Sequence, residues 1–182
     1  MRVITGSARG RRLETPSGDA VRPTTDVVKE AVFSIIQFFI EDRVFLDAFA
    51  GSGQMGIEAI SRGAKKAYFA DNSKRSMDII RKNIAVCGFE ENAVTCQTDT
   101  LSFLRSTNEK FDIVFLDPPY QTGLLQQALG LSERVVKPGG FIICEHPKEE
   151  TLPEETGYFR LKKCYKYGKI MISVYTKQDE EA

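Results

Sequence analysis

From residue 44 onward, short apolar runs alternate with stretches of helical periodicity, and this alternation restricts the fold more than any other feature of the chain. Strands that alternate with single helices are typical of a parallel sheet covered on both faces. The helical stretches repeat apolar residues every three or four positions, as Met77, Ile80 and Ile84 do. The sequence therefore predicts an α/β fold, with strands near 44–48, 66–70, 93–97, 111–116 and 139–145.

The C-terminal part of the chain has a different pattern. Apolar runs at 158–161 and 170–175 flank a polar stretch that contains Gly168, which predicts an antiparallel hairpin at the edge of the sheet. Before it, an apolar helical stripe begins at Leu124, and the turn-forming sequence Lys-Pro-Gly-Gly at 137–140 is expected to end that helix. The polar residues 178–182 are expected to form a frayed tail.

The part of the chain before residue 44 is rich in glycine and arginine to about Arg22 and then becomes helical. Thr24 or Thr25 can cap the first turn of this helix, because a threonine oxygen accepts a hydrogen bond from a backbone N–H there. A length of 182 residues fits one domain. We expect a single domain, 1–182, made of a basic hairpin extension (1–22), a helix (24–40) and a core (44–176).

Composition limits the partners and the location of the protein. Lys plus Arg (25) equal Asp plus Glu (25), so a nucleic acid would have to meet a local basic patch. No apolar run approaches the ~20 residues of a membrane span, and the N-terminus lacks the apolar core of a secretory signal. The four cysteines are far apart, which does not favour a metal cluster or a disulfide framework. We expect a cytoplasmic monomer without a metal or a membrane partner.

A glycine-rich loop follows the first predicted strand. Residues Gly51 to Gly56 match the pattern G-x-G-x-x-G, and Asp71 lies at the end of the next strand. The pattern fits both a dinucleotide and S-adenosylmethionine. A carboxylate at Asp47 would repel a pyrophosphate, but it would attract the ammonium and sulfonium groups of S-adenosylmethionine. Asp47 therefore favours the methyl donor.

Three carboxylates follow three successive strands, at the edge where open α/β sheets bind ligands. Asp71 is expected to accept hydrogen bonds from ribose hydroxyls and Asp99 from an adenine amine. Alternatively, each aspartate could cap the helix that follows it. The predicted cofactor-binding residues are Asp47, Ala48, Phe49, Gly51, Ser52, Gly53, Asp71, Asn72, Asp99 and Thr100.

The sequence Asp117-Pro118-Pro119-Tyr120 directly follows the apolar run 111–116. The two prolines cannot continue the hydrogen bonding of a strand, so they fix a stiff turn. The Asp117 carboxylate and the Pro118 carbonyl beside the Tyr120 ring suit a planar group that carries an NH2, such as a nucleobase or an amide. We expect these four residues to be catalytic, with a core role at the end of the sheet as the alternative for Tyr120.

The glycine loop and this turn together resemble class I S-adenosylmethionine-dependent methyltransferases that modify amino groups. Over nearly its whole length the chain resembles the RsmD family of 16S ribosomal RNA guanine-N2 methyltransferases. The segments that carry this closer resemblance are 2–6, 9–13, 22–26, 56–64 and 167–169. The resemblance implies a Rossmann-like fold with a seven-stranded, mostly parallel sheet, an antiparallel C-terminal hairpin strand and a short N-terminal extension. It also implies the small ribosomal subunit, assembled or assembling, as the partner.

Two basic segments are candidates for contact with RNA. Residues 2–12 carry four arginines and no acid, and residues 160–169 carry five basic residues interleaved with two tyrosines. Such segments suit phosphates and unstacked bases, although either one alone is also typical of an ordinary solvated surface. The predicted RNA-binding residues are Arg2, Arg9, Arg11, Arg12, Arg22, Lys166 and Tyr167.

Other interpretations stay open at this point. The turn would also serve adenine-N6 or cytosine-N4 methylation in nucleic acid, or methylation of a protein glutamine amide, although the chain has no room for a DNA target-recognition region. A non-enzymatic alternative is an RNA-binding module that senses S-adenosylmethionine, but the Asp117 carboxylate would serve no purpose there. The chain could be a nicotinamide dehydrogenase only if the glycine loop is considered without the rest of the sequence.

Overall fold

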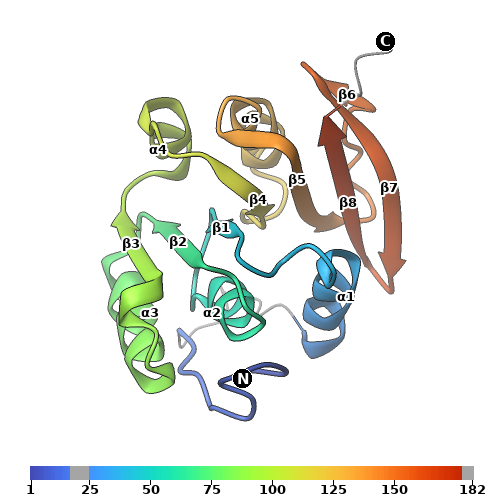
Figure 1. Ribbon diagram of the computed structural model, residues 1–182. Helices are drawn as coiled ribbons and strands as arrows, with labels where there is room; N and C mark the ends of the chain where they lie inside the picture. The colour runs from blue at the N-terminus through green and yellow to red at the C-terminus, as the bar shows by residue number, and fades with distance from the viewer. Residues whose placement is uncertain (17–24, 178–182) are drawn as a thin grey trace. The chain divides into compact units, whose positions relative to one another are not determined.

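The computed structural model describes residues 1–16 and 25–177 (Figure 1). The chain forms two compact units, Met1–Thr100 and Leu101–Ala182. The predicted RNA contact Arg22 and the predicted tail 178–182 lie outside the described residues. Among the helices in the described part of the chain, none combines the length and the apolar character needed to cross a membrane.

The first unit alternates helices with parallel strands. Its helices are α1 (Asp26–Ile36), α2 (Gln54–Ser61) and α3 (Lys74–Cys87), followed by the short 3-10 helix η1 (Glu90–Asn92). Its strands, in the order β3-β2-β1, are β1 (Val44–Asp47), β2 (Lys66–Asp71) and β3 (Ala93–Gln97). Because these strands are parallel, their carboxyl ends lie at one edge, where Asp47 and Asp71 end their strands.

The second unit begins parallel and ends antiparallel. Its helices are α4 (Thr100–Ser106), which starts at the boundary of the units, and α5 (Leu124–Ser132). Its strands are β4 (Phe111–Leu116), β5 (Val136–Pro147), β6 (Glu155–Thr156), β7 (Phe159–Tyr167) and β8 (Ile170–Lys177). They lie in the order β4-β5-β8-β7-β6, with β4 and β5 parallel and the remaining neighbours antiparallel. Every residue of β4 is buried, which explains its nearly continuous apolar sequence.

The N-terminal residues 2–12 form a small hairpin. Arg2 and Arg12 make an antiparallel bridge. The Val3 N–H donates to the Arg11 carbonyl at 2.9 Å, and the Gly10 N–H donates to the Val3 carbonyl at 2.9 Å. We call residues 1–14, which contain this hairpin, the arginine arm.

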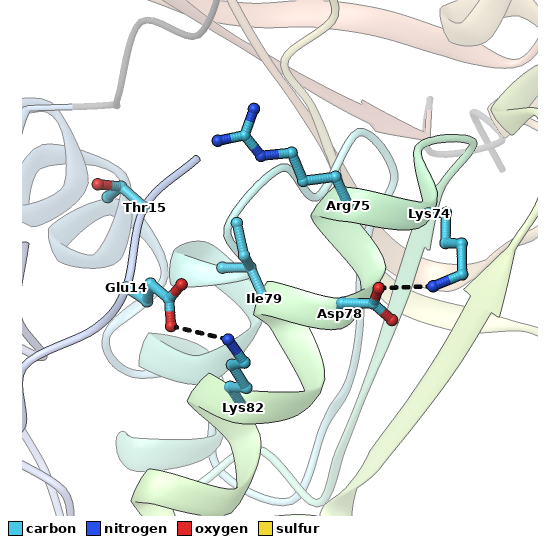
Figure 2. A pocket seen from close by; sticks show the side chains of 7 residues that line it. All are labelled: Glu14, Thr15, Lys74, Arg75, Asp78, Ile79 and Lys82. Carbon is cyan, nitrogen blue, oxygen red and sulfur yellow. Dashed lines mark hydrogen bonds and ion pairs between the residues drawn. The ribbon is translucent and has the colours of Figure 1, made fainter. Parts of the chain in front are cut away.

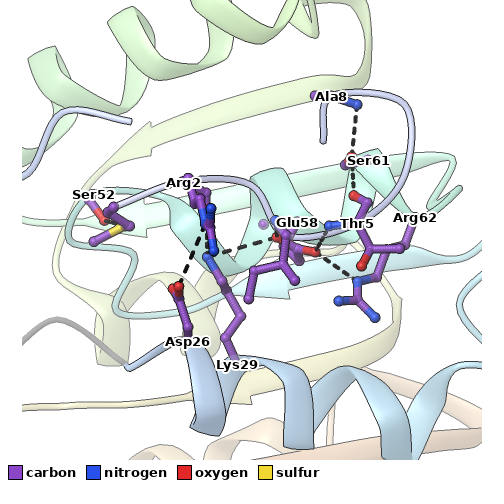
Figure 3. Close-up of polar contacts among 12 residues, drawn as sticks. Arg2, Thr5, Ala8, Asp26, Lys29, Ser52, Glu58, Ser61 and Arg62 are labelled. Carbon is purple, nitrogen blue, oxygen red and sulfur yellow. Dashed lines mark hydrogen bonds and ion pairs between the residues drawn. The ribbon is translucent and has the colours of Figure 1, made fainter. Parts of the chain in front are cut away.

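Buried polar groups hold the arginine arm on α2 (Figure 3). Glu58 has no exposed side-chain surface and accepts hydrogen bonds from the Ile4 N–H at 2.8 Å and the Thr5 N–H at 3.0 Å. Lys29 of α1 is equally buried, donates to the Arg2 carbonyl at 2.8 Å and lies 3.8 Å from Glu58. Burial lowers the pKa of Lys29, and the charge of Glu58 opposes this shift. Lys29 and Glu58 together therefore hold the first residues of the arginine arm in place.

The predicted α/β fold is confirmed, and β1 to β4 begin and end within one residue of their expected positions. The Thr25 side chain accepts a hydrogen bond from the Val28 N–H, as expected of an N-cap. The C-terminal hairpin is present as β7 and β8. Eight strands lie in residues 1–16 and 25–177 against the seven expected, because the two-residue β6 pairs with β7. α1 is shorter than the predicted 24–40, since a turn follows Ile36.

The prediction that Lys137-Pro138-Gly139-Gly140 ends a helix was wrong. α5 already ends at Ser132, and the four residues lie inside β5. Gly139 has φ +75°, and the register between β4 and β5 shifts between Phe111 and Ile113. An irregular position of this kind admits proline and glycine without ending the strand.

Candidate active site

The glycine loop joins β1 to α2 in a conformation that requires glycine. Gly51 and Gly53 have φ values of +57° and +77°, and Gly53 occupies the N-cap position of α2. A Cβ on Gly56 would lie 2.3 Å from the Phe69 ring of β2, so only glycine lets helix and strand approach this closely. A Cβ on Gly51 would meet nothing within 4 Å, so there is open space beside the first glycine.

Asp47, at the end of β1, is fully buried beneath the loop. Its Oδ2 accepts a hydrogen bond from the Gly56 N–H at 3.0 Å, in the first turn of α2. Burial raises the pKa of Asp47 to about 7; the Gly56 hydrogen bond acts in the opposite direction, and the charge of Asp71 adds a smaller upward shift. Asp47 therefore satisfies an amide of the helix, as a cap would, and titrates near neutral pH.

Asp71, at the end of β2, is half-buried and holds the first glycine. Its Oδ2 accepts from the Gly51 N–H at 2.9 Å, and its Oδ1 accepts from the Ser73 N–H at 2.8 Å. The N-cap of α3 is Ser73 itself, so Asp71 is not the cap. A carboxylate has about four acceptor positions, so two backbone amides leave capacity for hydroxyl donors.

The remaining predicted cofactor residues lie along the same edge. Thr100 is buried, and its hydroxyl donates to the Ala48 carbonyl directly after β1. The Thr98 N–H donates to the Asp71 carbonyl at 3.0 Å. Asp99 is exposed and directly precedes α4, at the position of an N-cap. Of the other predicted residues, Ser52 and Gly53 are buried, Phe49 is half-buried and Asn72 is exposed.

The Asp-Pro-Pro-Tyr turn lies in the second unit, directly after β4. Asp117 is half-buried, Pro118 is buried and Pro119 is exposed. Tyr120 is only half-buried, and its hydroxyl donates to Glu145 Oε1 of β5 at 3.4 Å. The ring therefore is not a fully buried core aromatic.

The predicted RNA-binding side chains are accessible where the structure describes them. The four arginines of the arm are exposed, and Arg2 lies 3.9 Å from Asp26. In the second unit, Lys166 is exposed and Tyr167 is half-buried at the end of β7. On the same strand, the Lys163 ammonium lies 4.8 Å from the centre of the Tyr165 ring.

A pocket of about 640 Å³ lies on α3 beside the end of the arginine arm (Figure 2). Acids and bases alternate around it: Glu14 lies 3.5 Å from Lys82, and Lys74 lies 2.8 Å from Asp78. Its lining residues are Glu14, Thr15, Lys74, Arg75, Asp78, Ile79 and Lys82. None of the predicted cofactor residues is among them.

Sequence reasoning missed several buried polar residues, two in the first unit and one in the second. Glu58 interrupts the apolar run of α2, Asn83 lies on the apolar stripe of α3, and Glu145 ends the apolar run of β5. A polar residue on an otherwise apolar face is the signal that could have identified them, because such residues are rarely buried without partners. In the described part of the chain, no group of three His, Cys, Asp or Glu side chains is arranged to hold a metal ion.

A family model described as Conserved hypothetical protein 95 matches residues 1–176. The chain belongs to this family. Ribosomal RNA small subunit methyltransferase D of Haemophilus influenzae is 37% identical over 89% of this chain and 86% of its own length. The YlbH protein of Bacillus subtilis is 35% identical over 98% of this chain and 100% of its own length. The solved structure of the yhhF protein of Escherichia coli is 32% identical, with a TM-score of 0.88 over 98% of both chains.

Membership of the Conserved hypothetical protein 95 family confirms the resemblance found in the sequence. The chain is a methyltransferase with a Rossmann-like fold. The interpretation of the glycine loop as part of a nicotinamide dehydrogenase is therefore rejected.

Proposed function

We propose that this protein transfers a methyl group from S-adenosylmethionine to the exocyclic N2 amine of a guanine in 16S ribosomal RNA. The name of the Haemophilus influenzae relative supports small-subunit ribosomal RNA as the substrate. The exposed arginines of the arm support contact with phosphates. We further propose that the enzyme is a monomer in the cytoplasm. It acts on assembled or assembling small subunits, because the chain is small and carries equal numbers of acidic and basic residues.

The hydrogen bonds of the loop amides favour S-adenosylmethionine over a dinucleotide as the cofactor. In a dinucleotide site the amides of the glycine loop face a pyrophosphate. Here the Gly51 and Gly56 amides donate to the carboxylates of Asp71 and Asp47. A second anion at these amides would meet two carboxylates, whereas a cation with ribose hydroxyls would be stabilised by them. The open space beside Gly51 leaves the backbone there accessible to a ligand atom.

The residues of the Asp-Pro-Pro-Tyr turn have the chemistry to bind and orient a guanine amine. When bound, S-adenosylmethionine supplies an electrophilic methyl group. Asp117 and the Pro118 carbonyl each accept one N–H of the amine, which directs its lone pair and stabilises the positive charge that develops on nitrogen. The Tyr120 ring stacks on the base, a contact worth ~1–3 kcal/mol at comparable sites. Asp117 or water then takes the proton that the methylated amine releases.

The proposed function is tested by transfer of labelled methyl groups to small ribosomal subunits, free ribosomal RNA and DNA in parallel, followed by nucleoside analysis. We expect label in N2-methylguanosine of 16S RNA, with subunits the better substrate. Label in adenine or cytosine of DNA would show that DNA, and not ribosomal RNA, is the substrate. Equal labelling of free RNA and subunits would contradict the preference for particles.

The affinity for S-adenosylmethionine is expected to rise with pH. Without cofactor the pKa of Asp47 is about 7, and a nearby cation favours the carboxylate. Binding therefore releases a proton, and the affinity increases about tenfold between pH 6 and pH 8 before it levels off. Calorimetry in buffers of different ionisation enthalpy measures both quantities.

The matched control for this pH dependence is Asp47→Asn. The amino group of the cofactor also titrates near pH 8, so the variant supplies the baseline for that contribution. The same pH dependence in variant and wild type would show that Asp47 does not contribute to it.

A further inference from the structure

Asn83 of α3 joins the arginine arm to the glycine loop. Its side chain is buried, with 1% exposure, and makes three hydrogen bonds to backbone groups far away in sequence. Its Oδ1 accepts from the Glu14 N–H at 2.8 Å, and its Nδ2 donates to the Glu14 carbonyl at 2.9 Å. The second N–H on Nδ2 donates to the Ser52 carbonyl, inside the glycine loop, at 2.9 Å. One amide group therefore fixes both segments.

Ser52 is also reached from the other end of the arm. Its hydroxyl lies 3.6 Å from the Met1 sulfur, and the Leu13 N–H donates to the Met1 carbonyl at 3.0 Å. The first residue of the arginine arm thus contacts the loop directly, and the last residue reaches it through Asn83. A shift of the arm would strain the contacts made by the hydroxyl and by the carbonyl of Ser52.

The hydrogen bonds that attach the arm to Lys29, Glu58 and Ser61 do not involve the loop. The Ser61 hydroxyl, at the end of α2, accepts from the Ala8 N–H at 3.0 Å and donates to the Thr5 carbonyl at 2.6 Å (Figure 3). A Cβ on Gly6 would lie 1.7 Å from the Ser61 carbonyl, so the arm lies directly against the helix end here. Ser61 therefore offers a matched comparison: it anchors the same arm as Asn83 without a bond to the loop.

We propose that Asn83 is a positioning residue that couples the arginine arm to the cofactor loop, so that binding of S-adenosylmethionine and binding of RNA strengthen each other. This inference rests on the proposed function. A buried amide that loses one partner is costly, so the Glu14 backbone and the Ser52 carbonyl keep their positions together. A cofactor that orders the loop then orders the arm that carries the arginines. By linkage, RNA must raise the affinity for the cofactor by the factor with which the cofactor raises the affinity for RNA.

The first test uses the wild-type protein and hydrogen exchange. We expect S-adenosylmethionine to slow amide exchange in residues 1–14 as well as in the loop 51–56. Normal cofactor binding and methylation without protection of residues 1–14 would overturn the coupling and leave the proposed function intact. A wild-type protein that binds no S-adenosylmethionine would overturn both.

The second test measures the coupling factor in Asn83→Ala and Ser61→Ala, with 16S ribosomal RNA as the probe. The factor is the ratio of cofactor affinities with and without RNA, and values of about 5–150 are typical of coupled sites. We expect Ser61→Ala to keep the wild-type factor and Asn83→Ala to bring it close to 1. Both variants must be folded without ligand, because partial unfolding lowers the apparent affinity and thereby changes this ratio. A wild-type factor in Asn83→Ala, or equal losses in both variants, would overturn the role of Asn83.

Discussion

Asp117→Ala is expected to lower turnover by at least about 100-fold, the usual effect of removing a group that stabilises charge developing in a transition state. The variant loses the acceptor that we propose directs the lone pair of the amine, while the glycine loop of the first unit is unchanged. We therefore expect little change in the affinity for S-adenosylmethionine. Single-turnover methylation of small ribosomal subunits measures the chemical step, and calorimetry measures the affinity.

Tyr120→Phe is the matched control for this prediction. It keeps an aromatic ring for stacking and removes only the hydroxyl that donates to Glu145 at 3.4 Å. We expect its rate to stay within a few-fold of wild type. Near wild-type methylation by Asp117→Ala would show that Asp117 has no catalytic role. A large loss of methylation rate in Tyr120→Phe would show that the hydroxyl of Tyr120, rather than its ring, is the essential group.

Asp47→Asn is expected to stabilise the free protein and to weaken cofactor binding at pH 8 by about tenfold or more. The pKa of Asp47 rises from 3.8 to about 7 in the folded state, so the folded state binds more protons than the unfolded one. The contribution of this group to stability is complete below pH 3.8 and is lost as the pH rises through 7. Asparagine keeps an acceptor for the Gly56 N–H without the buried charge. We expect a gain of about 2–4 kcal/mol at pH 8, because a pKa difference of about three units corresponds to about 4 kcal/mol at most.

Thermal unfolding at pH 5 and pH 8 measures this prediction without cofactor. The difference in Tm between the variant and the wild type should be larger at pH 8, where Asp47 is ionised. A difference that does not change with pH would show that the buried charge is not the cause. Unchanged affinity for S-adenosylmethionine at pH 8 would contradict the electrostatic role of Asp47 in cofactor binding.

Local patterns predicted most of the fold because hydrophobic period and turn chemistry act over a few residues. The buried run of β4 and the Thr25 cap of α1 are examples. The start of β5 was mispredicted for a non-local reason. A Cβ on Gly140 would lie 2.6 Å from the Asp112 carbonyl of β4, and Lys137 lies 2.9 Å from the Asp112 carboxylate. Packing against β4 therefore keeps residues 137–140 in β5, although this sequence in isolation favours a turn.

The candidate site also combines features that the local sequence predicts with features that depend on packing. Spacing alone placed Asp47 and Asp71 at the ends of successive strands, because parallel strands bring their carboxyl ends to one edge. It could not show that both carboxylates accept loop amides, since those bonds depend on how α2 and the loop pack on the strands. Asn83 was missed because its partners, Glu14 and Ser52, are distant in sequence.

The sequence by itself determined the order of the elements, the glycine loop, the Asp-Pro-Pro-Tyr turn and the family resemblance, all of which are written in neighbouring residues. The tertiary structure alone decided that the pKa of Asp47 is raised to about 7 and that the arginine arm is bonded to the glycine loop. Burial and long-range hydrogen bonds cause both effects. They arise only when segments far apart in the chain exclude water from the same polar groups.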